Sequence, residues 1–144
     1  MAERPRPPHL RARAVGLVLV GGTLGTAARE ALTLGFGPIG TFPATILAIN
    51  IVGALLLGML LESLTHRGED TGRRLSVRLI AGTGFLGGFT TYSALATDTG
   101  LLAIAGSPAL ALVNSMGTLV VGAVATWAGV VIADRLGNMR GRTR

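Results

Sequence analysis

Residues 84–93 read Gly-Phe-Leu-Gly-Gly-Phe-Thr-Thr-Tyr-Ser, and this stretch interrupts a long apolar segment of the chain. Glycine disfavours a helix by roughly 1 kcal/mol per position, and threonine and serine hydroxyls compete for backbone hydrogen bonds. We therefore expect a helix break here. One interpretation is a glycine kink stabilised by threonine hydroxyls. The other is unwound backbone at membrane depth, which lines an aqueous space and offers carbonyl oxygens to a cation.

The composition around this stretch points to a membrane protein. The chain has 144 residues, of which 49% are hydrophobic and 14% are charged. Soluble domains carry about 25% charged residues, so we expect lipid to face much of this surface. This excludes most soluble enzymes. The absence of cysteine excludes disulfides, thiolate nucleophiles and cysteine-ligated metals.

Four apolar stretches approach the roughly 20 residues that a helix needs to cross about 30 Å of hydrocarbon. The sequence predicts an all-α integral membrane protein with four transmembrane helices, the third of them broken in mid-membrane. The predicted spans are 14–34, 43–61, 76–97 and 108–133. They form one four-helix transmembrane domain over 14–133, between a basic N-tail (1–13) and a basic C-tail (134–144).

The arginines predict how the chain is oriented. All 13 basic residues are arginines, and 12 of them lie in the two tails and in the loop 67–78. Four spans place these three segments on one side, which the positive-inside rule makes cytoplasmic. We therefore expect a multi-pass protein of the plasma membrane, with both termini in the cytoplasm and lipid as its surroundings. Arginines beside apolar segments serve as orientation signals, so we expect no nucleic-acid partner.

Polar residues inside the spans are the candidate functional residues, because they are costly in lipid unless partnered. Asn50 could form an interhelical hydrogen bond or offer N–H groups to an anion in a wet cavity. Asn114 and Thr118 lie one turn apart, either as packing residues or as a polar stripe. Arg29 is the one arginine outside the basic segments. It is either an interfacial anchor that complements a helix C-terminus, or it concentrates anions at a pore mouth.

No combination of residues predicts catalysis. His9 and His66 have no companion ligands nearby in the sequence, and no serine has a histidine and a carboxylate arranged around it. We expect that the protein is not an enzyme.

The sequence resembles the Fluc/CrcB fluoride channel family over its whole membrane portion. The resemblance rests on residues 21–25 with Arg29, on Asn50 with Gly53, on the break at 84–93 and on residues 122–127. It implies a small four-span protein that assembles as an antiparallel dimer. It also implies a fluoride-specific channel through which fluoride leaves the cytoplasm passively, which lowers the toxicity of intracellular fluoride.

The resemblance also implies roles for individual residues. The backbone carbonyls of Gly87 and Thr90, with their counterparts in a second subunit, would hold a structural sodium ion that is not transported. Asn50 would face the pore. The family's box of two phenylalanines, which present ring edges to fluoride, falls here on Tyr92 and Leu95. The hydroxyl of Ser93 and the polar track of the fourth helix, represented by Asn114 and Thr118, would complete the fluoride contacts.

The charge bias favours a heterodimer. One sequence can insert in both orientations only when its arginine bias is small, and here 12 arginines stand against one. We hypothesise that this chain pairs with an oppositely oriented relative. Two alternatives stay open. One is a non-conducting structural subunit of such a heterodimer, and the other is a small multidrug-type, proton-coupled exporter with Glu30 as its only candidate carboxylate.

Overall fold

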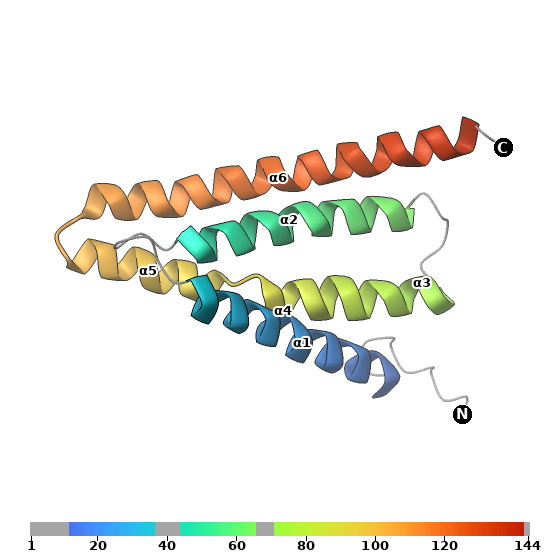
Figure 1. Cartoon of the computed structure of the whole chain (residues 1–144), viewed down its shortest axis with the longest axis horizontal. Coiled ribbons are helices and arrows are strands. Elements are labelled where there is room, and N and C mark those ends of the chain that lie inside the picture. The colour runs from blue at the N-terminus through green and yellow to red at the C-terminus, as the bar shows by residue number, and fades with distance from the viewer. Residues whose placement is uncertain (1–11, 37–43, 66–70, 143–144) are drawn as a thin grey trace, which may run out of the picture.

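The computed structural model describes residues 12–36, 44–65 and 71–142, and all its described elements are helices. The helices are α1 (Ala12–Phe36), α2 (Ala44–Thr65), α3 (Gly72–Val77), the π-helical η2 (Arg78–Leu86), α4 (Gly87–Phe89), α5 (Tyr92–Ile104) and α6 (Pro108–Arg142) (Figure 1). In this part of the chain three helices, α1, α2 and α6 as far as Met139, are long and apolar enough to cross a membrane. The all-helical class predicted from the sequence is therefore correct.

The helix boundaries differ from the predicted spans. Helix begins at Gly72, inside the segment 67–78 that was expected to be a loop, and residues 67–70 of that segment lie outside the described residues. At the other end, α6 continues to Arg142 and so includes most of the expected C-tail. The expected N-tail lies almost entirely outside the described residues.

Close backbone packing joins α1 to η2 and α4, which run side by side in Figure 1. Gly21 and Gly25 are the buried residues of α1. A Cβ atom added to Gly21 would lie only 2.9 Å from the Phe85 backbone nitrogen and 3.0 Å from the Gly84 Cα. The glycines of the first and third apolar segments therefore let two helix backbones touch, as small-residue motifs do in membranes.

The other contacts leave large apolar faces uncovered. Helix α2 packs mainly on α6, and α5 packs mainly on the first part of α6. The buried apolar core is small and includes Ile49, Leu86, Phe89 and Leu95. Ile104, by contrast, is 86% exposed, and large apolar side chains are exposed along α1, α2, α5 and α6. This distribution fits helices that face lipid or another subunit.

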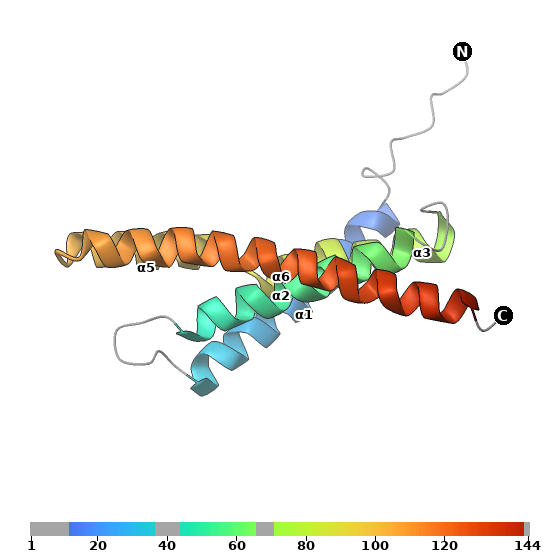
Figure 2. The same cartoon turned by 90° about the horizontal axis from the view of Figure 1, so that it is seen from above.

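The helix ends gather at two ends of the molecule. The start of α1, the end of α2, the start of α3 and the end of α6 lie at one end in both views (Figures 1 and 2). Four arginines from these helix ends have described side chains: Arg13, Arg73, Arg74 and Arg135. At the opposite end, the α5–α6 hairpin projects beyond the end of α1 and the start of α2.

Candidate functional site

The candidate site surrounds an interruption of helical backbone at two threonines. Thr90 (φ −79°, ψ 157°) and Thr91 (φ −148°, ψ 124°) are extended between α4 and α5. The glycines at 87 and 88 lie within helix, and the helix ends at Phe89, one residue after the glycine pair. The Thr91 hydroxyl accepts a hydrogen bond from the Ala94 N–H at 3.3 Å and so caps the start of α5.

Asn50 holds this interruption from the neighbouring helix α2. Its Oδ1 accepts the Thr91 N–H at 2.9 Å, and its Nδ2 donates to the Thr91 carbonyl oxygen at 3.1 Å. The side-chain amide thus satisfies both backbone groups of one residue, as a neighbouring strand would. A structural hydrogen bond, one of the two interpretations of Asn50, is therefore present, and its partner is the segment between α4 and α5. Because Nδ2 carries two hydrogens, one N–H is not used by this carbonyl.

Arg29 contacts the end of a helix other than its own. Its Nε donates to the Gly88 carbonyl oxygen at 3.4 Å, and the Thr26 hydroxyl donates to the same oxygen at 3.4 Å. Gly88 lies one residue before the end of the helical segment that began at Gly72. A guanidinium there complements the negative end of that helix. The Arg29 side chain is 22% exposed and lies 3.7 Å from the Glu30 carboxylate.

The carbonyl oxygens of Gly87 and Thr90 have the properties of cation ligands. Neither accepts a hydrogen bond from the part of the chain that the structure describes. Both residues line a surface groove of about 410 Å³ together with Arg78 and Thr83, and Gly87 is exposed. Unpaired carbonyls at the C-terminal end of a helix carry partial negative charge and suit a sodium ion. The backbone at these two positions therefore fits the expected ion.

A second polar cluster lies between α2, α5 and α6. Asn50, Asp98, Asn114 and Thr118 line one narrow crevice together with Leu95 and two apolar residues of α2. Asn114 and Thr118 are only 4% and 8% exposed, and Asn114 donates to the Thr99 hydroxyl at 3.1 Å. The structure thus brings together the predicted polar residues of the second and fourth apolar segments.

Asp98 is a member of this cluster that the sequence analysis missed. The predicted third span ended at residue 97, one position short of the carboxylate. The signal that could have identified it is its spacing: Asp98 follows Ala94 by four residues and Leu95 by three, so it falls on the face of α5 that packs toward α6.

Tyr92, Ser93 and Leu95 are not brought together. Tyr92 is 76% exposed and Leu95 is 7% exposed, so the two positions expected to form a box face different environments. Ser93 is exposed, and its hydroxyl lies 3.0 Å from that of Thr91. Within this chain, Leu95 faces the polar crevice, whereas Tyr92 and Ser93 face outward.

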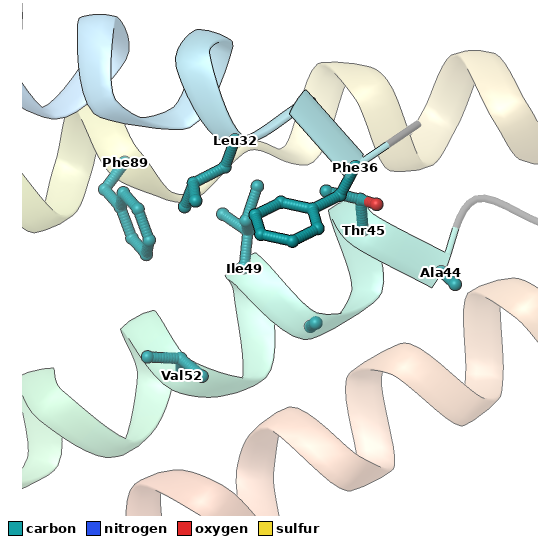
Figure 3. Close-up of a pocket in the computed structure, with 8 residues that line it drawn as sticks. Leu32, Phe36, Ala44, Thr45, Ile49, Val52 and Phe89 are labelled. Carbon is teal, nitrogen blue, oxygen red and sulfur yellow. The ribbon is translucent and has the colours of Figure 1, made fainter. Parts of the chain in front are cut away.

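An apolar groove of about 470 Å³ lies between α1 and α2 on another side of the interruption (Figure 3). Leu32 and Phe36 of α1 face Ile49 and Val52 of α2, and the Phe89 side chain lies at one end. Thr45 contributes the polar side chain in this lining. This lining offers no set of hydrogen-bond donors for an ion. The polar crevice between α2, α5 and α6 is therefore the better candidate for an ion site.

The described residues contain no group of three or more His, Asp or Glu side chains that could hold a metal ion. Glu30, the candidate carboxylate of a proton-coupled exporter, has a 57% exposed side chain beside Arg29. A carboxylate in that position is not enclosed by the helices as an exchange site would need to be.

Comparisons with known proteins place the chain in a family. Residues 16–130 match the family described as CrcB-like protein, Camphor Resistance (CrcB). The fluoride-specific ion channel FluC 2 of Leifsonia xyli subsp. xyli is 47% identical over 94% of this chain and 93% of its own. FluC 1 of Cutibacterium acnes is 44% identical over 83% of this chain and 82% of its own. FluC of Paracoccus denitrificans is 41% identical over 83% of this chain and 93% of its own. The chain is a multi-pass membrane protein that belongs to the CrcB family, as its sequence motifs indicated.

Proposed function

We propose that this chain is a subunit of a fluoride-specific ion channel that lets fluoride leave the cytoplasm passively and so lowers its toxicity. Relatives named fluoride-specific ion channels match most of the chain and most of their own length. The observation that carries the proposal is the interrupted helix held by Asn50 beside a crevice with further polar groups. Unwound backbone of this kind is tolerated at membrane depth where it lines a cavity or a binding site.

In this proposal, Gly72–Ile104 forms the third of four spans and is broken at Thr90 and Thr91 in mid-membrane. The support is geometric, because the segment runs beside α1 from the arginine-rich end of the molecule toward the opposite end (Figure 1). The arginine-rich end and both termini would be cytoplasmic by the positive-inside rule. The protein would then lie in the plasma membrane of the cell.

Fluoride would pass along the polar side chains that flank the break. The remaining N–H of Asn50, together with Asn114 and Thr118, supplies neutral hydrogen-bond groups that offset part of the cost of removing water from a small anion. Tyr92 and Ser93 face outward and would contribute their ring edge and hydroxyl to a pore shared with a second subunit. Leu95 lines the crevice without donating a hydrogen bond.

Arg29 would attract fluoride toward the pore mouth. Its guanidinium is partly exposed and positively charged, so it raises the local concentration of anions. Selectivity over chloride would come from a narrow passage and neutral donors, because a buried fixed charge would hold the anion too strongly.

The working unit would be an antiparallel dimer with a sodium ion at its centre. The unpaired carbonyls of Gly87 and Thr90 lie in an open groove, where the same two oxygens of a second subunit could complete an oxygen shell. The sodium ion would be structural and would not be transported. When bound, the sodium ion would neutralise the partial negative charges at the helix ends of the two subunits.

The second subunit would be an oppositely oriented relative, because the 12 arginines in the two tails and in the segment 67–78 bias this chain toward a single orientation. Leu95 supports a second candidate function, because it occupies one of the two positions where the family has a phenylalanine and carries no aromatic ring. This chain could then be the structural, non-conducting half of that heterodimer. Co-purification of a tagged chain with an untagged relative tests the pairing. A stable assembly of this chain alone that conducts fluoride would contradict it.

Growth at graded fluoride concentrations tests the proposed function in cells. A bacterium that lacks its own fluoride exporters should regain growth when it produces this chain together with the relative. A matched strain producing the Asn50→Ala variant with the same relative should stay sensitive. Equal sensitivity with and without the wild-type pair, at confirmed membrane expression, would contradict the proposal.

A further inference from the structure

Residues at the start of α1, in α3 and at the start of η2 line a small crevice. The starts of α1 and α3 lie at the arginine-rich end of the molecule (Figures 1 and 2). The crevice has a volume of about 150 Å³. Leu17 of α1 and Leu75 with Leu79 provide apolar walls, and Arg13, Gly72 and Ser76 line it as well. We call it the α1–α3 crevice. It shares no lining residue with the groove at Gly87 and Thr90 or with the polar crevice.

Among the described residues that line the α1–α3 crevice, Arg13 carries a charge, and Arg73 and Arg74 directly follow the lining residue Gly72. Arg13 and Arg73 are exposed, and Arg74 is half-buried in the first turn of α3. Within the described ranges, no carboxylate lies within ion-pair distance of any of these three guanidinium groups. The Ser76 hydroxyl donates to the Gly72 carbonyl at 3.1 Å. Its oxygen can therefore still accept a hydrogen bond from a ligand hydroxyl.

The combination of apolar walls and guanidiniums that have no ion-pair partner among the described residues matches one ligand class in a membrane. We propose that the α1–α3 crevice binds an anionic phospholipid. The phosphate would lie against the guanidiniums of Arg13 and Arg73, and part of an acyl chain would lie along Leu17, Leu75 and Leu79. Guanidinium groups bind phosphate with paired hydrogen bonds, and basic pockets between membrane helices on the cytoplasmic side hold anionic headgroups.

The location supports a lipid over a free anion. The crevice lies where the apolar part of α1 meets the arginines that precede it, which is the depth of the headgroups when α1 crosses a membrane. A free phosphate would use the guanidiniums but leave the leucine walls in contact with water. A phospholipid covers both surfaces at once. This inference concerns lipid recognition and does not depend on which ion the protein transports.

Native mass spectrometry of the full chain in detergent, titrated with phosphatidylglycerol or phosphatidylcholine, tests the proposal. We expect saturable binding of one phosphatidylglycerol per crevice and much weaker binding of phosphatidylcholine. Each arginine near an anionic surface contributes about fivefold in affinity, so R13Q should weaken phosphatidylglycerol binding about fivefold and R13Q/R73Q more. R135Q, on α6 away from the crevice, is the matched control and should bind like the wild type.

Four results would overturn the proposal. The first is equal binding of both lipids, and the second is an equal loss in R13Q and R135Q, which would show only a general attraction to negative charge. The third is full competition by inorganic phosphate or glycerol phosphate, which would show that the acyl chain is not bound. A phosphatidylglycerol site lost on removal of residues 1–11, but unchanged in R13Q and R13Q/R73Q, would assign the effect to the tail and also contradict the proposal.

Discussion

Asn50 of α2 pairs with the backbone of Thr91 through both of its amide atoms, at 2.9 Å from the Thr91 nitrogen and 3.1 Å from the Thr91 oxygen. These two bonds satisfy a residue that belongs to neither adjoining helix. A buried amide or carbonyl left without a partner costs about 1–3 kcal/mol. Asn50 therefore stabilises the interruption of the helix in addition to any contact it makes with an ion.

Two substitutions of Asn50 test its effect on stability and its effect on fluoride flux. N50A removes both bonds, and we expect it to lower the melting temperature in detergent and to abolish fluoride flux. N50D keeps the acceptor for the Thr91 N–H but loses the donor and adds charge, so it should lose flux with a smaller loss of stability. N138A is the control, because Asn138 is exposed and its amide bonds to Asp134 in its own helix. Normal stability and flux in N50A would contradict this account.

The contact between α1 and η2 predicts a difference between two glycines of one helix. A Cβ at Gly21 would meet backbone atoms of Gly84 and Phe85, which cannot move independently of η2. We expect G21A to destabilise the protein by about 1–3 kcal/mol, the usual cost of overpacking. Gly16 has nothing within 4 Å of such a Cβ, so G16A should be neutral or slightly stabilising. Thermal unfolding of both variants measures the difference, and equal shifts would show that the helices do not touch here.

Arg29 and Thr26 donate to the same Gly88 carbonyl, which allows charge to be separated from hydrogen bonding. We expect R29Q to lower fluoride flux several-fold at low ionic strength and less at high salt, because charges more than about 10 Å apart are screened at 0.1 M. T26V removes the other donor and keeps the charge, so its flux should stay near that of the wild type. A similar loss in T26V and R29Q at every salt concentration would assign Arg29 a structural role only.

Thr118 tests the polar crevice. T118V keeps the volume of the side chain and removes a hydroxyl that lines the crevice with Asn50 and Asn114. We expect fluoride flux to fall by about tenfold or less, which corresponds to the net value of one hydrogen bond. T126V is the matched control, because the Thr126 hydroxyl bonds to the Gly122 carbonyl of its own helix. Unchanged flux in T118V would place the ion path elsewhere.

Removal of sodium tests whether the carbonyl oxygens of Gly87 and Thr90 bind a structural sodium ion. Exchange of sodium for a large organic cation should lower the thermal stability of the assembled protein and promote its dissociation, because partial negative charges would then face each other. Dissociation measured by size-exclusion chromatography provides a readout independent of flux. An assembly equally stable in both cations would exclude a structural sodium ion.

The sequence was sufficient for the helical class and for the polar positions inside the apolar segments, because both depend on local composition or periodicity. The position of the interruption was predicted only within a range. A break was expected within residues 84–93, and packing against α1 keeps the glycines of that stretch helical, so the break falls at Thr90 and Thr91. The burial of Leu95 beside Asp98 could not be predicted, because it depends on how α5 is rotated against α6. Such a rotation is set by tertiary contacts that no single segment specifies.

Fluoride efflux from liposomes is the measurement that tests the central claim most directly. Liposomes loaded with potassium fluoride should release fluoride when this chain and an oppositely oriented relative are present and a potassium ionophore discharges the membrane potential. Chloride-loaded liposomes should release little under the same conditions, and no proton gradient should be needed. Absence of fluoride efflux from the chain alone and from the pair, or efflux that requires a proton gradient, would contradict the account.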